Sequence, residues 1–131
     1  MTTSAKPRVT LLTTIELHTL DVACAPIRSA FGRPPYLVGT AGVGDATSYR
    51  DVDVRLILDD DQFAEVCPDK ARWELLCLCI GTYLRERTGL PVDFQIQQQT
   101  AANAKHDKPR NPLGMGRTFA GGGDGTPEWG I

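Results

Sequence analysis

Long apolar runs, paired cysteine motifs and an excess of either charge are all missing from this 131-residue sequence. No stretch approaches the roughly 18 consecutive apolar residues that a membrane-spanning helix needs, so we expect no membrane partner. The amino terminus lacks the apolar core of a signal peptide, which indicates a soluble, cytoplasmic protein. The formal net charge of -2 gives no general attraction to duplex DNA.

The four cysteines never stand in the CxxC spacing that is typical of zinc and redox sites. In a cytosolic chain, thiols without such spacing are usually reduced and buried. We therefore expect free, buried cysteines and no zinc centre.

The length favours one domain, because 131 residues can build a single two-layer core. The composition changes after Thr100, where Gly, Pro and basic residues accumulate. We therefore expect a domain over residues 1–100 and an extended Gly/Pro-rich tail over 101–131.

Helical spacing of apolar residues marks two main helices. The first follows Thr13-Thr-Ile-Glu16, which has the form of a capping box, and ends at Gly32. An interior proline, Pro26, predicts a kink or a division into two shorter helices. The second helix follows Pro68, carries Trp73 on its apolar stripe and ends at Gly89.

Three apolar segments have the length and alternation of strands: residues 36–38, 51–58 and 90–98. In the last two, every second residue is apolar and the intervening residues are polar, so each strand has a core face and an open face. These elements predict an α/β (α+β) fold, with a small mixed sheet and the two main helices packed on one face.

Three aspartates fall on the open faces of these strands. Asp51 and Asp53 are two residues apart, so their side chains share a face about 7 Å apart along the strand. Asp93 repeats the apolar-Asp-apolar pattern on a later strand. If the two strands are neighbours, three carboxylates meet, and such oxygen ligands suit Mg²⁺ or a pair of metal ions.

Gly39-Thr40 lies at the end of the first predicted strand. A glycine there lets the backbone approach a phosphate closely, and the next hydroxyl and amides can bind the phosphate oxygens. Ten residues separate Thr40 from Asp51. The pair alone is a weak signal, but its position before two strand aspartates makes it a fairly specific signal for phosphate binding.

These residues resemble the DNA polymerase beta-like nucleotidyltransferase superfamily, particularly its minimal single-domain members. The family pattern is Gly-Ser, a spacer, Asp-x-Asp and a later strand aspartate, which here reads Gly39-Thr40, ten residues, Asp51-Val52-Asp53 and Asp93. The match covers about residues 14–98, and Gly44-Asp45-Ala46 resembles a tripeptide often found in the family spacer.

The resemblance implies metal-dependent transfer of a nucleotidyl group from a nucleoside triphosphate to a hydroxyl acceptor, with release of pyrophosphate. Asp51, Asp53 and Asp93 would bind Mg²⁺, or Mn²⁺ in its place, and Asp93 would also help to deprotonate the acceptor. Gly39 and Thr40 would hold the triphosphate. The acceptor could be a protein, an RNA or a small molecule.

The chain departs from the family pattern in its spacer, where Ala41 and Val43 replace the usual arginines. Phosphate charge would then fall to Arg50, Arg55 or the tail. The absence of these arginines favours an alternative: a catalytically weak or inactive binding module, such as an antitoxin-type protein with a protein partner.

Two further alternatives remain from the residues themselves. The aspartates at 51 and 53 could form a solvated strand face with Arg55 as a cross-strand charge partner. The basic tail could bind a nucleotide or RNA, which would show as steep salt dependence.

Overall fold

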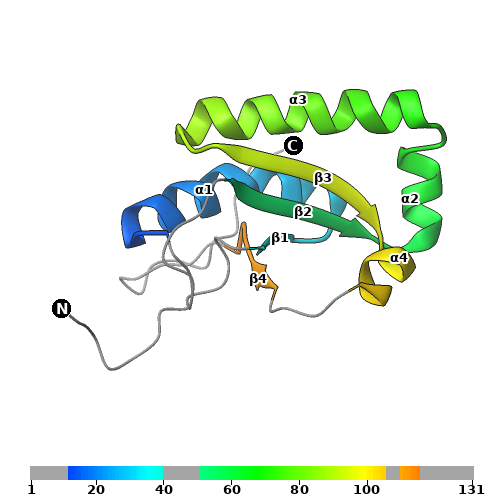
Figure 1. The fold of residues 1–131 in the computed structure, drawn as a ribbon, viewed down its shortest axis with the longest axis horizontal. Coiled ribbons are helices and arrows are strands. Elements are labelled where there is room, and N and C mark those ends of the chain that lie inside the picture. The colour runs from blue at the N-terminus through cyan, green and yellow to red at the C-terminus, as the bar shows by residue number, and fades with distance from the viewer. Residues whose placement is uncertain (1–11, 40–50, 106–109, 116–131) are drawn as a thin grey trace, which may run out of the picture.

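The computed structural model describes residues 12–39, 51–105 and 110–115, which form an α/β fold around one mixed sheet (Figure 1). The elements in chain order are α1 (Thr14–Phe31), β1 (Pro35–Val38), β2 (Val52–Leu58), α2 (Asp60–Val66), α3 (Lys70–Thr88), β3 (Val92–Gln98), α4 (Gln99–Ala104) and β4 (Asn111–Pro112). The strand order is β3-β2-β1-β4. Strands β2 and β3 are parallel, whereas β1 is antiparallel to β2 and to β4. The predicted fold class is confirmed.

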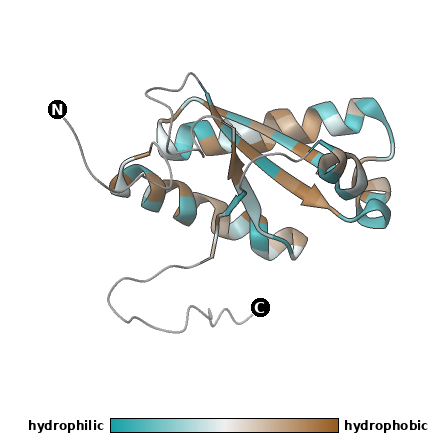
Figure 2. Ribbon diagram, turned by 60° about the horizontal axis from the view of Figure 1, so that its bottom comes forward, coloured by the Kyte–Doolittle hydropathy of each residue, from teal (hydrophilic) through white to brown (hydrophobic). Residues whose placement is uncertain are grey.

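The core lies between the sheet and the two long helices, α1 and α3 (Figure 1). Alternate residues of β2 and β3 are buried in it, and the hydropathy colours alternate along these strands in Figure 2. The fully or almost fully buried side chains include Leu20, Cys24, Val52, Val54, Leu56, Leu84, Phe94 and Ile96. Burial of each valine, leucine, isoleucine or phenylalanine among them stabilises the folded state by roughly 1.5 to 3 kcal/mol. The polar residues between them are thereby fixed on the opposite, open face of the sheet.

Helix α1 begins and ends as its sequence predicts. The Thr13 hydroxyl accepts from the Glu16 amide, the Glu16 carboxylate accepts from the Thr13 amide, and Gly32 closes the helix at φ 74°. The expected division at Pro26 is wrong, because α1 continues through it as one helix. Pro26 and Val22, whose carbonyl would otherwise accept the missing bond, are both exposed residues, so water can take the place of that bond.

Helix α3 begins after the N-cap Asp69 and ends at Gly89 in the left-handed conformation. Its stripe packs against the core through Trp73, Leu76, Cys77, Ile80 and Leu84, as predicted. The indole nitrogen of Trp73 donates to the carbonyl oxygen of Ile96 at 2.7 Å, which joins the helix to β3. No helix among the described residues is long and apolar enough to span a membrane.

Part of the segment after Thr100 packs on the domain. Leu113 is fully buried in the core, and its amide donates to the Pro35 carbonyl oxygen at 2.8 Å. The buried Asp21 carboxylate of α1 accepts from the Gly114 amide at 2.8 Å. Gly114 has φ +70°, and a Cβ there would approach the Cys24 carbonyl oxygen to 2.8 Å. Residues 110–115 therefore complete the sheet and the core, although they lie beyond the domain limit expected at residue 100.

All four cysteines are free. Cys24 and Cys67 are buried as expected, Cys77 is partly buried, and Cys79 is exposed, contrary to the expectation. Burial, with the nearby Asp21 charge, raises the pKa of the Cys24 thiol to about 12. Cys24 is therefore an unreactive core residue at neutral pH.

Candidate metal site on the open face of the sheet

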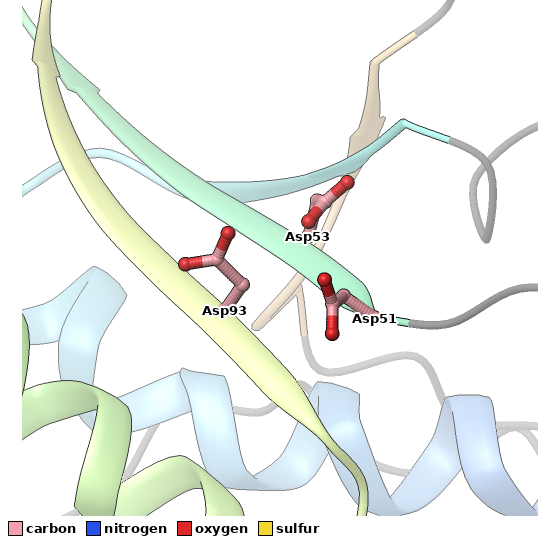
Figure 3. Close-up of side chains that lie close together, drawn as sticks. All are labelled: Asp51, Asp53 and Asp93. Atoms are coloured by element: carbon pink, nitrogen blue, oxygen red, sulfur yellow. The ribbon is translucent and has the colours of Figure 1, made fainter.

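The register of β2 and β3 brings the three predicted aspartates together. The strands pair in parallel, with Val52 opposite Val92 and Asp53 opposite Asp93. Because side chains of paired residues point to the same face, Asp53 and Asp93 are direct neighbours on the open face. Asp51 lies immediately before β2, on the same side as Asp53 (Figure 3).

Carboxylate oxygens from Asp51, Asp53 and Asp93 all lie within 4.8 Å of one another. We call these three residues the carboxylate cluster. Asp51 is exposed, and the side chains of Asp53 and Asp93 are 25% and 44% exposed, so the cluster is open to solvent. Three convergent carboxylate oxygens at this spacing could bind a metal ion, because hard cations prefer oxygen ligands.

Arg55 lies beside the cluster and forms ion pairs with two of its carboxylates. Its guanidinium is 3.4 Å from an Asp93 carboxylate oxygen and 3.7 Å from an Asp53 carboxylate oxygen. It also donates to the backbone carbonyl oxygens of Asp93, at 2.7 Å, and Val54, at 3.1 Å. One positive charge therefore partly balances three carboxylates. This agrees with the alternative in which Arg55 is a charge partner of the strand aspartates. A phosphate-binding role for Arg55 stays a prediction.

The pKa of the Asp53 carboxyl is raised above its ordinary value. Burial is the main cause; Arg55 opposes the rise, whereas Asp93 and Asp51 add to it. An anion that is disfavoured by burial and by like charges is stabilised by a bound cation. The electrostatics of Asp53 therefore favour a cation at the cluster.

Gly39 packs directly against Asp53. Its φ is +72°, and a Cβ at this position would overlap the Asp53 carboxylate. Two separate features thus require glycine here: the left-handed backbone and the contact with the cluster. Thr40 and Arg50, the other residues predicted to bind the triphosphate, lie outside the described residues, so their roles stay predictions.

A pocket of about 650 Å³ adjoins the cluster. Val38, Gly39 and Arg55 line the end near the carboxylates, and α4 residues line the far end. Sequence reasoning treated Lys105 and Arg110 as parts of a basic tail and missed this pocket. No local pattern could have shown this pocket, because β4 is too short to have a periodic pattern. Only the pairing of β4 with β1 in the folded chain brings Arg110 to the pocket.

Comparisons of the chain with protein-family models, with curated proteins and with solved structures gave no match.

Proposed function

We propose that the protein is a metal-dependent nucleotidyltransferase that uses the carboxylate cluster as its metal site. The observation that carries the proposal is the convergence of Asp51, Asp53 and Asp93 within 4.8 Å from two neighbouring parallel strands. The sequence resemblance to the DNA polymerase beta-like superfamily supplies the reaction class. The close contact between Gly39 and Asp53 adds support, because Gly39 is one residue of the predicted phosphate-binding pair and Asp53 is one of the predicted metal ligands.

In the proposed reaction the acceptor hydroxyl oxygen forms a bond to the α-phosphorus of a nucleoside triphosphate. The bond from that phosphorus to the bridging oxygen breaks, and pyrophosphate leaves with the electron pair. Asp93 accepts the hydroxyl proton, because its side chain is more exposed than that of Asp53, its partner on the neighbouring strand. A bound Mg²⁺ or Mn²⁺ supplies Lewis acidity and charge neutralisation at the phosphates.

Residues around the cluster hold these groups in position. Arg55 is fixed by two backbone carbonyl oxygens, so its positive charge stays beside Asp53 and Asp93. Gly39 lies against Asp53, and in the proposal Gly39, Thr40 and the neighbouring amides would hold the triphosphate. Charge that the absent spacer arginines would supply falls to Arg55 and Arg50.

The test is transfer of label from each α-labelled nucleoside triphosphate, with Mg²⁺ or Mn²⁺, to components of a host-cell extract. The proposal expects a labelled product with the wild-type protein and none with Asp53→Asn. Asp61→Asn is the matched control, because Asp61 is an exposed aspartate of α2 outside the cluster. Labelling that survives in Asp53→Asn would contradict the proposal.

A second candidate is a catalytically inactive binding module, such as an antitoxin-type protein that binds another protein. The ion pairs of Arg55 with Asp53 and Asp93 favour it, because they partly satisfy the carboxylates without any metal. This candidate expects a copurifying protein and an unchanged biological effect in the double variant Asp51→Asn, Asp53→Asn. Loss of that effect in the double variant would count against it.

A further inference from the structure

The pocket beside the carboxylate cluster has largely apolar walls. Ile57 of β2, Phe63 of α2 and Trp73 of α3 contribute side chains to it. The indole nitrogen of Trp73 is already bonded to Ile96, which fixes the ring as part of the wall. A volume of about 650 Å³ lies within the range typical of sites for small organic molecules. The walls therefore suit the flat, apolar body of a small molecule.

The charged residues of the pocket are all cationic. Arg55, Lys105 and Arg110 line it, and none of its described lining residues is acidic. Arg110 is held in place because its guanidinium donates to the Asn103 side-chain oxygen at 3.0 Å and to the Ala102 carbonyl oxygen at 3.3 Å. Fixed positive charge beside apolar walls selects an organic anion over a neutral or cationic molecule.

One end of the pocket lies next to the cluster. Gly39 contacts Asp53, Arg55 binds Asp93, and both Gly39 and Arg55 also line the pocket. A molecule that fills the pocket can therefore place one end beside the carboxylates while its anionic group meets Lys105 or Arg110 at the other. This arrangement fits the acceptor of the transfer reaction.

We propose that this pocket is the acceptor site, and that the acceptor is a small organic anion with a flat apolar body and a hydroxyl group. This inference rests on the proposed function, in which that hydroxyl attacks the α-phosphorus and pyrophosphate leaves. In the proposed function the triphosphate is held by Gly39, at the end of the pocket near the cluster, and by Thr40. A macromolecular acceptor would use a surface larger than this pocket.

The pocket is tested first by binding alone, with the full chain and with neither metal nor nucleotide present. The probe is 8-anilinonaphthalene-1-sulfonate, a flat aromatic anion, followed by fluorescence and by amide shifts in NMR spectra. We expect one dye per chain and shifts in α4 and the end of β2. Ala102→Trp, which fills the pocket from α4, should weaken binding at least about tenfold, by direct exclusion. Circular dichroism then checks that the variant is folded.

Charge is tested by reversal inside and outside the pocket. Lys105→Glu should weaken dye binding about fivefold, because an attraction becomes a repulsion at a solvent-exposed site. Lys70→Glu is the control, because Lys70 is an exposed lysine on α3 that does not line the pocket, and it should change binding less than about twofold. The uncharged N-phenyl-1-naphthylamine should bind more weakly than the sulfonate. Equal binding of both dyes, or unchanged binding in Ala102→Trp and Lys105→Glu, would overturn the anion pocket.

The acceptor role is tested by transfer of label to small molecules of a cell extract. Ala102→Trp should abolish labelling while Mn²⁺ binding at the cluster stays intact. Labelling at the wild-type rate in a variant that no longer binds the dye would overturn the acceptor role and leave the proposed function standing. If the wild-type protein labels nothing, both the proposed function and the acceptor role are contradicted. Dye binding then still tests whether the pocket binds an organic anion.

Discussion

At the scale of single residues, Gly39 and Asp53 show how a backbone requirement and a site requirement coincide. Gly39 has φ +72°, and Gly32 has φ +74° at the end of α1. A Cβ at Gly32 would meet nothing within 4 Å, whereas at Gly39 it would overlap the Asp53 carboxylate. The two glycines therefore share a backbone conformation, and only Gly39 contacts the cluster.

This pair gives the first prediction. Gly32→Ala should cost roughly 1 to 2 kcal/mol of unfolding free energy, because an L-residue is strained in the left-handed region. Gly39→Ala should cost at least about 1 kcal/mol more, because it also displaces Asp53. Urea denaturation measures both costs. Equal costs in the two variants would show that Asp53 moves freely away from residue 39.

The raised pKa of Asp53 gives a prediction about pH. A carboxyl whose pKa is higher in the folded than in the unfolded state has no effect on stability while both states are protonated. Its cost appears as pH rises past the ordinary value of about 3.9 and is complete above the folded-state pKa. Metal-free Asp53→Asn should therefore be more stable than wild type at neutral pH.

The advantage of Asp53→Asn should disappear on acidification to pH values below the ordinary aspartate pKa. Urea denaturation in the presence of a chelator, at neutral pH and at acid pH, measures the difference. Asp61→Asn on the exposed surface of α2 controls for general effects of removing a negative charge. A metal-free Asp53→Asn protein that is less stable than wild type at neutral pH would contradict the assigned cause of the shift.

Arg55 gives a third prediction, based on its bonds to Asp93 and its ion pair with Asp53. Arg55→Met should destabilise the metal-free protein by roughly 1 to 3 kcal/mol, because charge-assisted hydrogen bonds are lost and the carboxylates repel one another. Added Mn²⁺ should recover much of that loss, since a cation replaces the guanidinium charge. Thermal unfolding with and without Mn²⁺ measures the recovery.

Arg33→Met is the control for Arg55→Met. Arg33 pairs with Asp59 at 3.7 Å on the surface, so its loss should cost less than about 1 kcal/mol and show no recovery with Mn²⁺. Equal recovery in both variants would mean that Mn²⁺ acts away from the cluster.

At the scale of elements, the strands that carry the site could be predicted and the segment that completes the sheet could not. Alternation in residues 51–58 and 90–98 sets which side chains are buried, so it also places Asp53 and Asp93 on the open face. Strand β4 has two residues, Asn111 and Pro112, which offer no periodic signal. Its position depends on contacts with distant residues, which only the folded chain brings together.

Asp21 gives the prediction that belongs to this scale. It is a buried carboxylate on α1, and it accepts from the amides of Gly114, at 2.8 Å, and Met115, at 3.4 Å. Asp21→Ala should cost roughly 1 to 3 kcal/mol, because it leaves a buried amide without an acceptor. Hydrogen exchange should speed up at residues 113–115.

Asp21→Asn keeps an oxygen that can accept and should have a smaller effect than Asp21→Ala. Similar exchange rates at residues 113–115 in Asp21→Ala and wild type would show that Leu113 alone holds this segment against α1.

At the scale of the whole molecule, the two faces of the sheet have different roles. Helices α1 and α3 cover one face of the sheet and provide the core, while the other face carries the carboxylate cluster; the adjoining pocket is lined by strand residues and also by Trp73 of α3. Sequence reasoning could predict this division and the three aspartates, because both follow from alternation along strands. The position of Arg55 against the cluster, and the pocket under α4, depend on side-chain geometry that no local pattern encodes.

The measurement that tests the central claim most directly is titration of the metal-free protein with Mn²⁺, followed by electron paramagnetic resonance. The variants are Asp93→Asn and the control Asp61→Asn. If Asp93 joins Asp51 and Asp53 in one site across the β2–β3 pair, Asp93→Asn should weaken Mn²⁺ binding at least about tenfold, and Asp61→Asn should bind as wild type does. Mn²⁺ binding that is unchanged in Asp93→Asn would contradict the three-carboxylate site.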